Sequence, residues 1–145
     1  MIGLASDHAG YELKQFIKTY LDKKGIAYID FGTDAPVSCN YADYGHLLAA
    51  AVEKGEVYPG IAVCGSGNGI NMTVNKHPDI RSALCWCAEI AHLARLHNDA
   101  NILTLPGRFL SMNETEKILD EFLNTAFEEG RHQARIDSIP VKTTR

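Results

Sequence analysis

The chain lacks both a long apolar run and a dense cluster of basic residues. Among its 145 residues, no window approaches the roughly 20 apolar positions that a membrane-spanning helix needs. The first seven residues hold no basic segment, which argues against a secretory signal. The formal net charge is −4, and lysine and arginine are spread out, so nucleic acid and membrane are poor candidate partners. We expect one cytoplasmic globular domain over residues 1–145, because 46% hydrophobic content supplies a full core.

The spacing of the cysteines matches no metal site. The chain has four cysteines, at positions 39, 64, 85 and 87. Cys85 and Cys87 lack the two-residue spacer and the second ligand pair of a zinc site. A disulfide framework is typical of smaller secreted chains. We therefore expect free thiols, with Cys85 and Cys87 at a strand end that leads into a helix.

Internal repeats, low-complexity tracts and linkers are absent, and strand-like and helix-like segments alternate instead. Short apolar runs predict strands, and apolar residues at helical spacing predict helices between them. Five such units predict a parallel sheet covered by helices on both faces. The expected strands are 2–6, 26–31, 60–64, 81–85 and 101–105. The expected helices lie around 13–21, 42–54, 69–77, 88–96 and 111–130, the last with a capping box at Ser111–Glu114 and an end at Gly130.

Ligands of such folds bind beyond the carboxyl ends of the strands. This rule selects Asp7 and His8 after the first strand and residues 64–69 after the third. It also selects the loops after the fourth and fifth strands. Asp7 is equally suited to cap the following helix, a role that leaves His8 free to act.

Alternating glycines follow the third strand. Gly65, Gly67 and Gly69 let the backbone turn tightly and leave N–H groups uncovered, as an anion site before a helix requires. A plain tight turn is the other interpretation. The loop lacks the third glycine of a dinucleotide fingerprint, since Ile70 stands in its place, and the third strand is an unusual position for that fingerprint. The pattern favours an anion and argues against a nicotinamide.

Cys64 closes the third strand directly before this loop. The positive end of a helix favours the thiolate form of a neighbouring cysteine. Taken alone, the residue is better interpreted as a small buried hydrophobe, because most free cysteines are. Its place at a strand end beside an anion loop shifts the interpretation toward a base or nucleophile.

Two further polar groups stand out. Residues 97–99 (His-Asn-Asp) precede the fifth strand; a lone histidine there is usually a surface residue, but polar neighbours accompany it. Arg131 and Arg135 share one face if the tail is helical. Such a pair is either a solvated face or a clamp for a phosphate.

Four segments together resemble the signature stretches of the ribose-5-phosphate isomerase B family. They are residues 6–10, 64–70, 97–101 and 129–135, in that family's order and at similar spacing. Each stretch alone is weak evidence, whereas four together are specific, and the resemblance spans residues 2–139. It implies a three-layer α/β/α sandwich, Rossmann-like, with a five-stranded parallel sheet of order 2-1-3-5-4. It also implies a C-terminal arm at about 131–145.

The resemblance further implies an isomerase that interconverts ribose 5-phosphate and ribulose 5-phosphate through a cis-enediol. No metal and no organic cofactor are expected. The expected partner is a second copy of the chain, in a homodimer or a dimer of dimers whose active sites are shared between subunits.

Roles follow from the resemblance position by position. Cys64 matches the general base that takes the proton from C2. Some members use a glutamate of the loop instead, for which Asn68 and Asn71 cannot substitute. Ser66 matches a residue that relays protons between O1 and O2, and the N–H groups of residues 65–69 match an anion hole. The remaining matches are His97 with Asp7 for ring opening, Asn98 and Tyr41 for the sugar, and His8, Arg108, Arg131 and Arg135 for the phosphate. The binding set thus comprises His8, Tyr41, Gly65, Gly67, Asn68, Gly69, Asn98, Arg108, Arg131 and Arg135.

Two other functions remain open at this point. An isomerase of a six-carbon sugar phosphate, such as allose or galactose 6-phosphate, is the nearest alternative. The cysteine, the His97 loop and the arginine tail lie in one chain here, which favours a self-sufficient pentose-phosphate enzyme. A non-catalytic phosphate-binding or receiver-like module is the other, but Asp7 has no second acid beside it. Turnover of ribose 5-phosphate separates an isomerase from a non-catalytic module, and comparing kcat/KM on ribose 5-phosphate and allose 6-phosphate separates the two isomerases.

Overall fold

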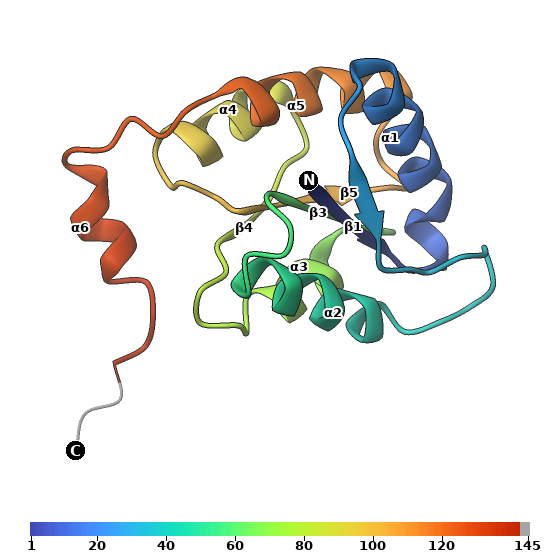
Figure 1. Cartoon of the computed structure of the whole chain (residues 1–145), viewed down its shortest axis with the longest axis horizontal. Helices are drawn as coiled ribbons and strands as arrows, with labels where there is room; N and C mark the ends of the chain where they lie inside the picture. The colour runs from blue at the N-terminus through green and yellow to red at the C-terminus, as the bar shows by residue number, and fades with distance from the viewer. Residues whose placement is uncertain (143–145) are drawn as a thin grey trace.

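Five parallel strands form a sheet through the middle of the molecule (Figure 1). The computed structural model describes residues 1–142, so residues 143–145 of the expected domain and arm lie outside the described residues. The spatial order of the strands is 2-1-3-5-4, as the resemblance implied. The strands are β1 (Ile2–Ser6), β2 (Tyr28–Asp30), β3 (Gly60–Cys64), β4 (Ser82–Leu84) and β5 (Ile102–Pro106).

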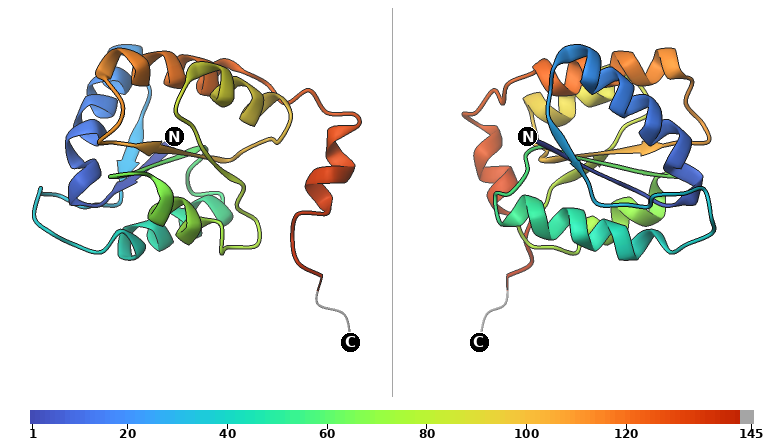
Figure 2. Two further views of the ribbon diagram at one scale, coloured as in Figure 1. Left: turned by 180° about the vertical axis from the view of Figure 1, so that it is seen from behind. Right: turned by 45° about the vertical axis from the view of Figure 1, so that its right-hand side comes forward.

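Helices cover both faces of the sheet and complete a three-layer α/β/α sandwich. The helices are α1 (Tyr11–Lys24), α2 (Tyr41–Glu53), α3 (Asn68–Val74), α4 (Ala88–Leu96), α5 (Met112–Asn124) and α6 (His132–Asp137), with a 3-10 turn at His8–Gly10. In Figure 1, α1, α4 and α5 lie above the sheet, and α2 and α3 lie below it. The left view of Figure 2 shows α6 standing apart from these layers. None of the helices in residues 1–142 is both long and apolar enough to span a membrane.

The three central strands are buried along their whole length. Parallel strands covered on both faces carry continuous apolar runs, which is why β1, β3 and β5 show no alternation of polar and apolar residues. Their side chains divide between two cores. Leu4 and Leu103 join Phe122 on the side of α1, α4 and α5, whereas Ala62 packs with Leu48 on the side of α2 and α3.

The last long helix begins as predicted but ends early. The capping box of Ser111 and Glu114 is present. The helix ends at Asn124 rather than at Gly130, because Thr125 adopts an extended conformation (φ −103°, ψ 121°). The Thr125 carbonyl accepts a hydrogen bond from Nε of Arg95 (3.3 Å), which ties the chain to α4 at this point. A contact with a distant helix therefore overrides the local helical pattern.

The helix after the glycine loop is also shorter than expected and ends at Val74 instead of near His77. The Asn75 side chain donates to the Ser82 carbonyl (3.0 Å) and accepts from the Ser82 N–H (2.8 Å). These two bonds fasten the end of α3 to the start of β4. The strand predicted at 26–31 likewise shortens to β2, while the other strands differ from the prediction by one or two residues at most.

Cys85 and Cys87 lie where the end of β4 leads into α4, as the sequence pattern predicted. Cys85 is fully buried after β4, and Cys87 precedes the first residue of α4. Burial, with a smaller contribution from Cys87, raises the pKa of the Cys85 thiol to about 12. A thiol with so high a pKa is protonated and inert near neutral pH. All four cysteines are free.

Candidate active site

A cavity of about 520 Å³ opens at the carboxyl ends of β1 and β3. The chain passes from β1 to β2 on one side and places β3 on the other side of β1, so the strand order reverses between β1 and β3. Ligands of open α/β sheets bind at this switch point. The lining residues are Asp7, His8, Ala9, Cys39, Asn40, Tyr41, Cys64, Gly65, Ser66, Gly69 and Arg108.

Cys64 is the last residue of β3 and is 4% exposed. Its carbonyl accepts a hydrogen bond from the Gly107 N–H (2.8 Å), and the next carbonyl, that of Gly65, accepts from the Arg108 N–H (3.0 Å). The backbone around the thiol is thereby fixed against the turn after β5. The same turn brings Arg108 to the cavity, although the sequence pattern alone gave no reason to select it.

The glycine loop has the shape that its composition predicts. Gly67 is left-handed (φ 79°), a conformation that other residues adopt rarely. A Cβ at Gly69 would collide with the ring of Tyr41, so the glycine lets this ring lie against the loop. The Ser66 hydroxyl accepts from the Asn68 N–H (3.2 Å). Gly67 and Asn68 shape the loop without lining the cavity.

His8 is oriented by the loop that precedes α2. Its Nδ1 accepts a hydrogen bond from the Cys39 N–H (3.2 Å). Because a backbone N–H is always the donor, Nδ1 carries no proton in this contact, and the neutral ring carries its proton on Nε2. That N–H can donate to an anionic ligand. Asp7 lies beside it and caps the 3-10 turn by accepting from the Gly10 N–H (3.0 Å), so the capping role and the cavity position coexist.

A buried lysine anchors the loop that carries Cys39 to the cavity. The Lys14 side chain is fully buried, and its Nζ donates to Asp30 Oδ1 (2.8 Å) and to the Thr33 carbonyl (2.7 Å). Burial lowers the pKa of the Lys14 amino group, although the hydrogen bond and charge of Asp30 oppose this shift. Lys18 pairs with the other oxygen of Asp30 (2.5 Å). The start of the loop is therefore tied to α1 and β2.

Three cavity residues were not predicted, namely Ala9, Cys39 and Asn40. Asn40 is the N-cap of α2 and accepts from the Ala42 N–H (2.9 Å). An asparagine directly before a helical pattern is a recognisable start signal. Combined with the strand-end rule, that signal identifies the loop after β2 as a wall of the site.

Four other predicted site residues do not line this cavity: His97, Asn98, Arg131 and Arg135. Parallel pairing places Gly60 opposite Ile102 and Cys64 opposite Pro106. The His97 turn precedes β5, so it lies at the opposite edge of the sheet from Cys64. At about 3.3 Å per residue, strand length alone separates the two edges by roughly 13 Å. One chain therefore does not unite its own Cys64 with its own His97.

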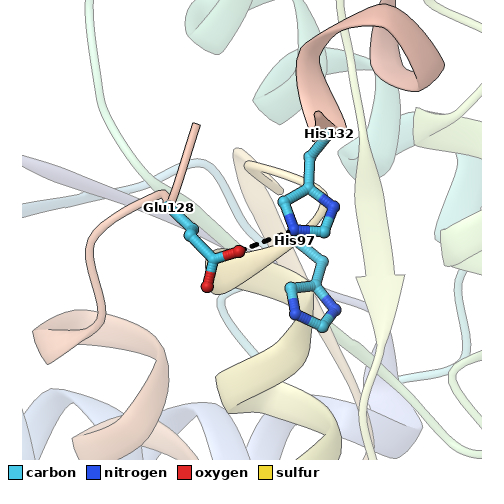
Figure 3. A group of neighbouring side chains, drawn as sticks. All are labelled: His97, Glu128 and His132. Atoms are coloured by element: carbon cyan, nitrogen blue, oxygen red, sulfur yellow. Dashed lines mark hydrogen bonds and ion pairs between the residues drawn. The ribbon is translucent and has the colours of Figure 1, made fainter. Parts of the chain in front are cut away.

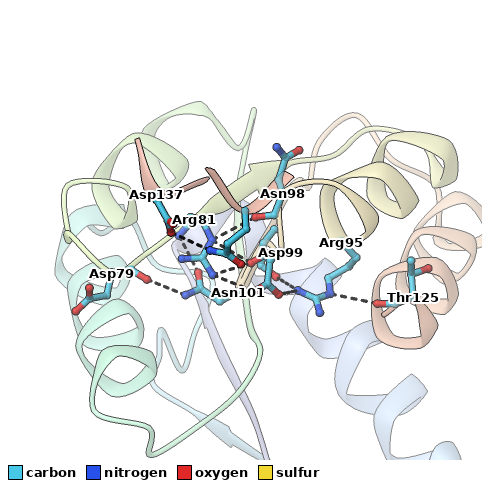
Figure 4. Close-up of polar contacts among 10 residues, drawn as sticks. Asp79, Arg81, Arg95, Asn98, Asp99, Asn101, Thr125 and Asp137 are labelled. Carbon is cyan, nitrogen blue, oxygen red and sulfur yellow. Dashed lines mark hydrogen bonds and ion pairs between the residues drawn. The ribbon is translucent and has the colours of Figure 1, made fainter. Parts of the chain in front are cut away.

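The turn at residues 97–101 is held by two arginines (Figure 4). Nε of Arg81 donates to the carbonyls of Asn98 (3.2 Å) and Asp99 (3.1 Å). Nη1 of Arg95 donates to Asp99 Oδ1 (2.9 Å). Asp99 is left-handed (φ 47°), which is uncommon outside glycine, and these bonds hold it in that conformation. His97 and Asn98 thus project from a rigid turn.

His97 also contacts the arm. Its ring stacks on that of His132, with 4.3 Å between centroids and 21° between planes, and Glu128 accepts a hydrogen bond from His132 (Figure 3). Arg131 is the N-cap of α6, and Arg135 lies in its last turn. The predicted helical spacing of the two arginines is therefore present, on a segment that stands apart from the cavity.

Comparison with known proteins decides the family. The ribose/galactose isomerase family model matches residues 2–139. The chain belongs to this family. It is 42% identical over 139 residues to a probable ribose-5-phosphate isomerase B of Mycoplasma pneumoniae, covering 95% of this chain and 91% of the relative. It is 38% identical to ribose-5-phosphate isomerase B of Escherichia coli, over 95% and 93% of the two chains.

Solved structures of ribose-5-phosphate isomerase B share the fold. The structure of ribose-5-phosphate isomerase B from Thermotoga maritima matches with a TM-score of 0.94 and 44% identity, covering 96% of each chain. The enzyme from Mycoplasma genitalium, solved with bound ribulose-5-phosphate, matches with a TM-score of 0.90 and 41% identity over 95% and 92% of the chains. The resemblance carried by the four sequence segments is confirmed.

Proposed function

We propose that the chain is a cytoplasmic aldose–ketose isomerase that interconverts ribose 5-phosphate and ribulose 5-phosphate through a cis-enediol. The observation that carries this proposal is the cavity at the switch point. One wall holds the thiol of Cys64, and another holds two donors for an anion, His8 and Arg108. A base and an anion site within one 520 Å³ cavity suit a short phosphorylated sugar.

The reaction begins with removal of the C2 proton of the open-chain aldose. Cys64 takes this proton as thiolate and returns it to C1, while Ser66 moves a proton between O1 and O2. General base catalysis contributes about 10²–10⁴-fold to such a step. N–H groups of the loop residues that line the cavity, Gly65, Ser66 and Gly69, stabilise the enediolate oxygens, and one preorganised donor contributes about 3–4 kcal/mol at best.

The phosphate end orients the sugar. Nε2–H of His8 and the guanidinium of Arg108 donate hydrogen bonds to two of the phosphate oxygens. Arg131 and Arg135 complete the clamp, because charge-assisted and bidentate bonds are the strong contacts to phosphate. Binding energy at this remote group holds C2 against the base.

A second copy of the chain supplies the residues that the cavity lacks. His97, Asn98 and the arm lie at the opposite sheet edge from Cys64, so they reach the cavity of a neighbouring subunit in a homodimer or dimer of dimers. His97, assisted by Asp7, opens the furanose ring before the C2 proton is removed, and Asn98 and Tyr41 contact the sugar hydroxyls. The arm spans about residues 131–145 of a single isomerase domain, residues 1–145.

Turnover of ribose 5-phosphate in the presence of EDTA tests this function. We expect interconversion without added metal, and absence of turnover by a folded oligomer contradicts the proposal. Comparing kcat/KM on ribose 5-phosphate and allose 6-phosphate decides between pentose and hexose, since the family includes galactose isomerases.

Mixed subunits test the shared site. Cys64→Ala and Arg135→Ala chains, each inactive at low substrate, are refolded together. In a two-fold dimer about a quarter of the wild-type activity should return, since half of the dimers are mixed and each holds one intact site of two. No recovery would place both residues in one subunit's site.

A further inference from the structure

Three side chains with metal-binding atoms meet where the arm leaves the body of the protein (Figure 3). His97 caps the end of α4, His132 opens α6, and Glu128 lies in the segment between α5 and α6. Their ligand atoms lie within 4.8 Å of one another. Within residues 1–142, no other group of three histidine, cysteine or carboxylate side chains converges in this way.

The group has the composition of a zinc site. Two imidazoles and one carboxylate form a known zinc ligand set, which leaves a fourth position open. Bonds of about 2.0–2.2 Å in a tetrahedral site put ligand atoms roughly 3.3 Å apart. Nε2 of His132 and Oε1 of Glu128 are already 2.9 Å apart. The His97 ring lies stacked on the His132 ring, with 4.3 Å between centroids and 21° between planes, so one of the two rings has to turn for both to aim a nitrogen at the same ion.

The backbone prepares this arrangement. The Glu128 N–H donates to the Leu96 carbonyl (2.9 Å), which fixes the carboxylate beside the end of α4. Glu129 (φ 70°) and Gly130 (φ 64°) are both left-handed and turn the chain so that residue 132 returns to residue 128. Left-handed non-glycine residues are uncommon and cluster at functional sites.

Charge and access suit a cation. Glu128 is exposed, and its Oε1 accepts a hydrogen bond from Nε2 of His132 (2.9 Å), so a carboxylate oxygen already faces the imidazole. His132 is only 5% exposed, and His97 is half-buried. A cation therefore arrives from solvent at Glu128 and meets the two imidazoles behind it.

We propose that His97, Glu128 and His132 bind a divalent d-block cation of the zinc type, and that the bound cation inhibits the enzyme by occupying the His97 imidazole. The inhibitory half rests on the proposed function, in which His97 opens the sugar ring. The binding half rests on the geometry alone. The cation has no part in turnover.

Direct titration tests the binding half. A chromogenic chelator competes with the full-length protein for Zn²⁺, and we expect one ion per chain. Glu128→Gln keeps a hydrogen-bond acceptor for His132 but is a poor metal ligand. It should weaken binding at least about tenfold, since even loss of an outer-shell partner costs 10–100-fold. Glu121→Gln is the matched control, because Glu121 pairs with His92 (3.1 Å) without a third metal-binding side chain from residues 1–142 beside them. The Glu121→Gln protein should bind Zn²⁺ like the wild type. Equal affinity in Glu128→Gln and wild type overturns the proposal.

Cobalt identifies the ligands. Co²⁺ added to the wild type should give visible d–d bands of a four-coordinate site without the near-ultraviolet band of a thiolate ligand. Both Glu128→Gln and His132→Asn should lose these bands. A thiolate band would place the metal on a cysteine such as Cys64 and overturn the assignment.

Inhibition is measured separately, by direct ultraviolet absorbance of the ketose, because zinc affects coupling enzymes. Zn²⁺ should inhibit the wild type, EDTA should reverse this, and Glu128→Gln should keep its basal turnover while needing at least about tenfold more Zn²⁺. Equal inhibition of both proteins overturns the inhibitory half. Failure of the proposed function appears differently, as no turnover in EDTA with the binding titrations unchanged.

Discussion

Replacing the buried Lys14 by methionine should lower the free energy of unfolding by about 3 kcal/mol. Nζ donates to Asp30 Oδ1 (2.8 Å) and to the Thr33 carbonyl (2.7 Å), and methionine fills most of the same space without replacing either bond. Removing one partner of a buried pair costs about 3–5 kcal/mol. The lower end applies here, because Asp30 keeps Lys18 (2.5 Å) and the Gly32 N–H (2.9 Å).

Urea unfolding followed by far-ultraviolet circular dichroism measures this change. With an unfolding entropy of about 2.1 cal/mol/K per residue, the same loss lowers Tm by about 10 °C for a chain of this length. Lys18→Met is the matched control, because it removes the other cation from the same carboxylate. Its side chain is 25% exposed, so the control should lose less than about 1 kcal/mol. Equal losses in the two variants would refute the argument from burial.

The same variant tests how the loop serves the site. The Thr33 carbonyl anchors the segment whose Cys39 N–H orients His8, a proposed phosphate ligand. Lys14→Met should therefore raise KM more than it lowers kcat, since Cys64 sits on a different strand. A fall in kcat with an unchanged KM would show that the loop does not position the phosphate site.

Three further outcomes are expected. Cys64→Ala should lower kcat by about 10²–10⁴-fold while a phosphate ligand still binds; wild-type-like turnover rules out the cysteine as base. Arg135→Ala should raise KM by roughly 10–100-fold, the value of one charged hydrogen bond; an unchanged KM means that the tail arginine is merely solvated. Although burial opposes it, hydrogen bonds from Lys14, Lys18 and Gly32 hold the pKa of Asp30 below its usual range. A carboxyl with a lowered folded-state pKa stabilises the protein above about pH 4 and loses that contribution as pH falls through the lowered value. Acid unfolding of Lys14→Met should accordingly show a shallower loss of stability below about pH 4 than that of the wild type.

Short apolar runs that alternate with segments of helical periodicity were sufficient to predict the parallel sheet, because strands covered on both faces carry continuous apolar residues. The strand-end rule likewise located Asp7 and Cys64. The predicted end of α5 was wrong. The contact between Arg95 and Thr125 joins residues 30 positions apart, so the local sequence pattern does not indicate it. Gly130 is left-handed as a cap glycine would be, but it serves a turn of the arm.

The signal at Asn40 marks the end of the loop after β2, but the path of that loop was not predictable, for a related reason. Its position depends on Lys14, and a lysine in an amphipathic helix has the same sequence pattern whether its amino group is solvated or buried. The arm was predicted to act in a neighbouring subunit only through the family resemblance. A single chain contains no local signal for what a second chain brings to its cavity.

The distance across the sheet between Cys64 and His97 has a consequence for the cell. With the proposed base and the proposed ring-opening acid at opposite edges of one molecule, the shared-site proposal predicts a catalytic output that depends on the square of the protomer concentration at low abundance. On this proposal, expression level acts as a threshold. Below the dissociation constant of the proposed dimer, each additional chain remains mostly an unpaired monomer, and above it, each additional chain completes one active site. Dilution of a purified sample should reproduce the same transition.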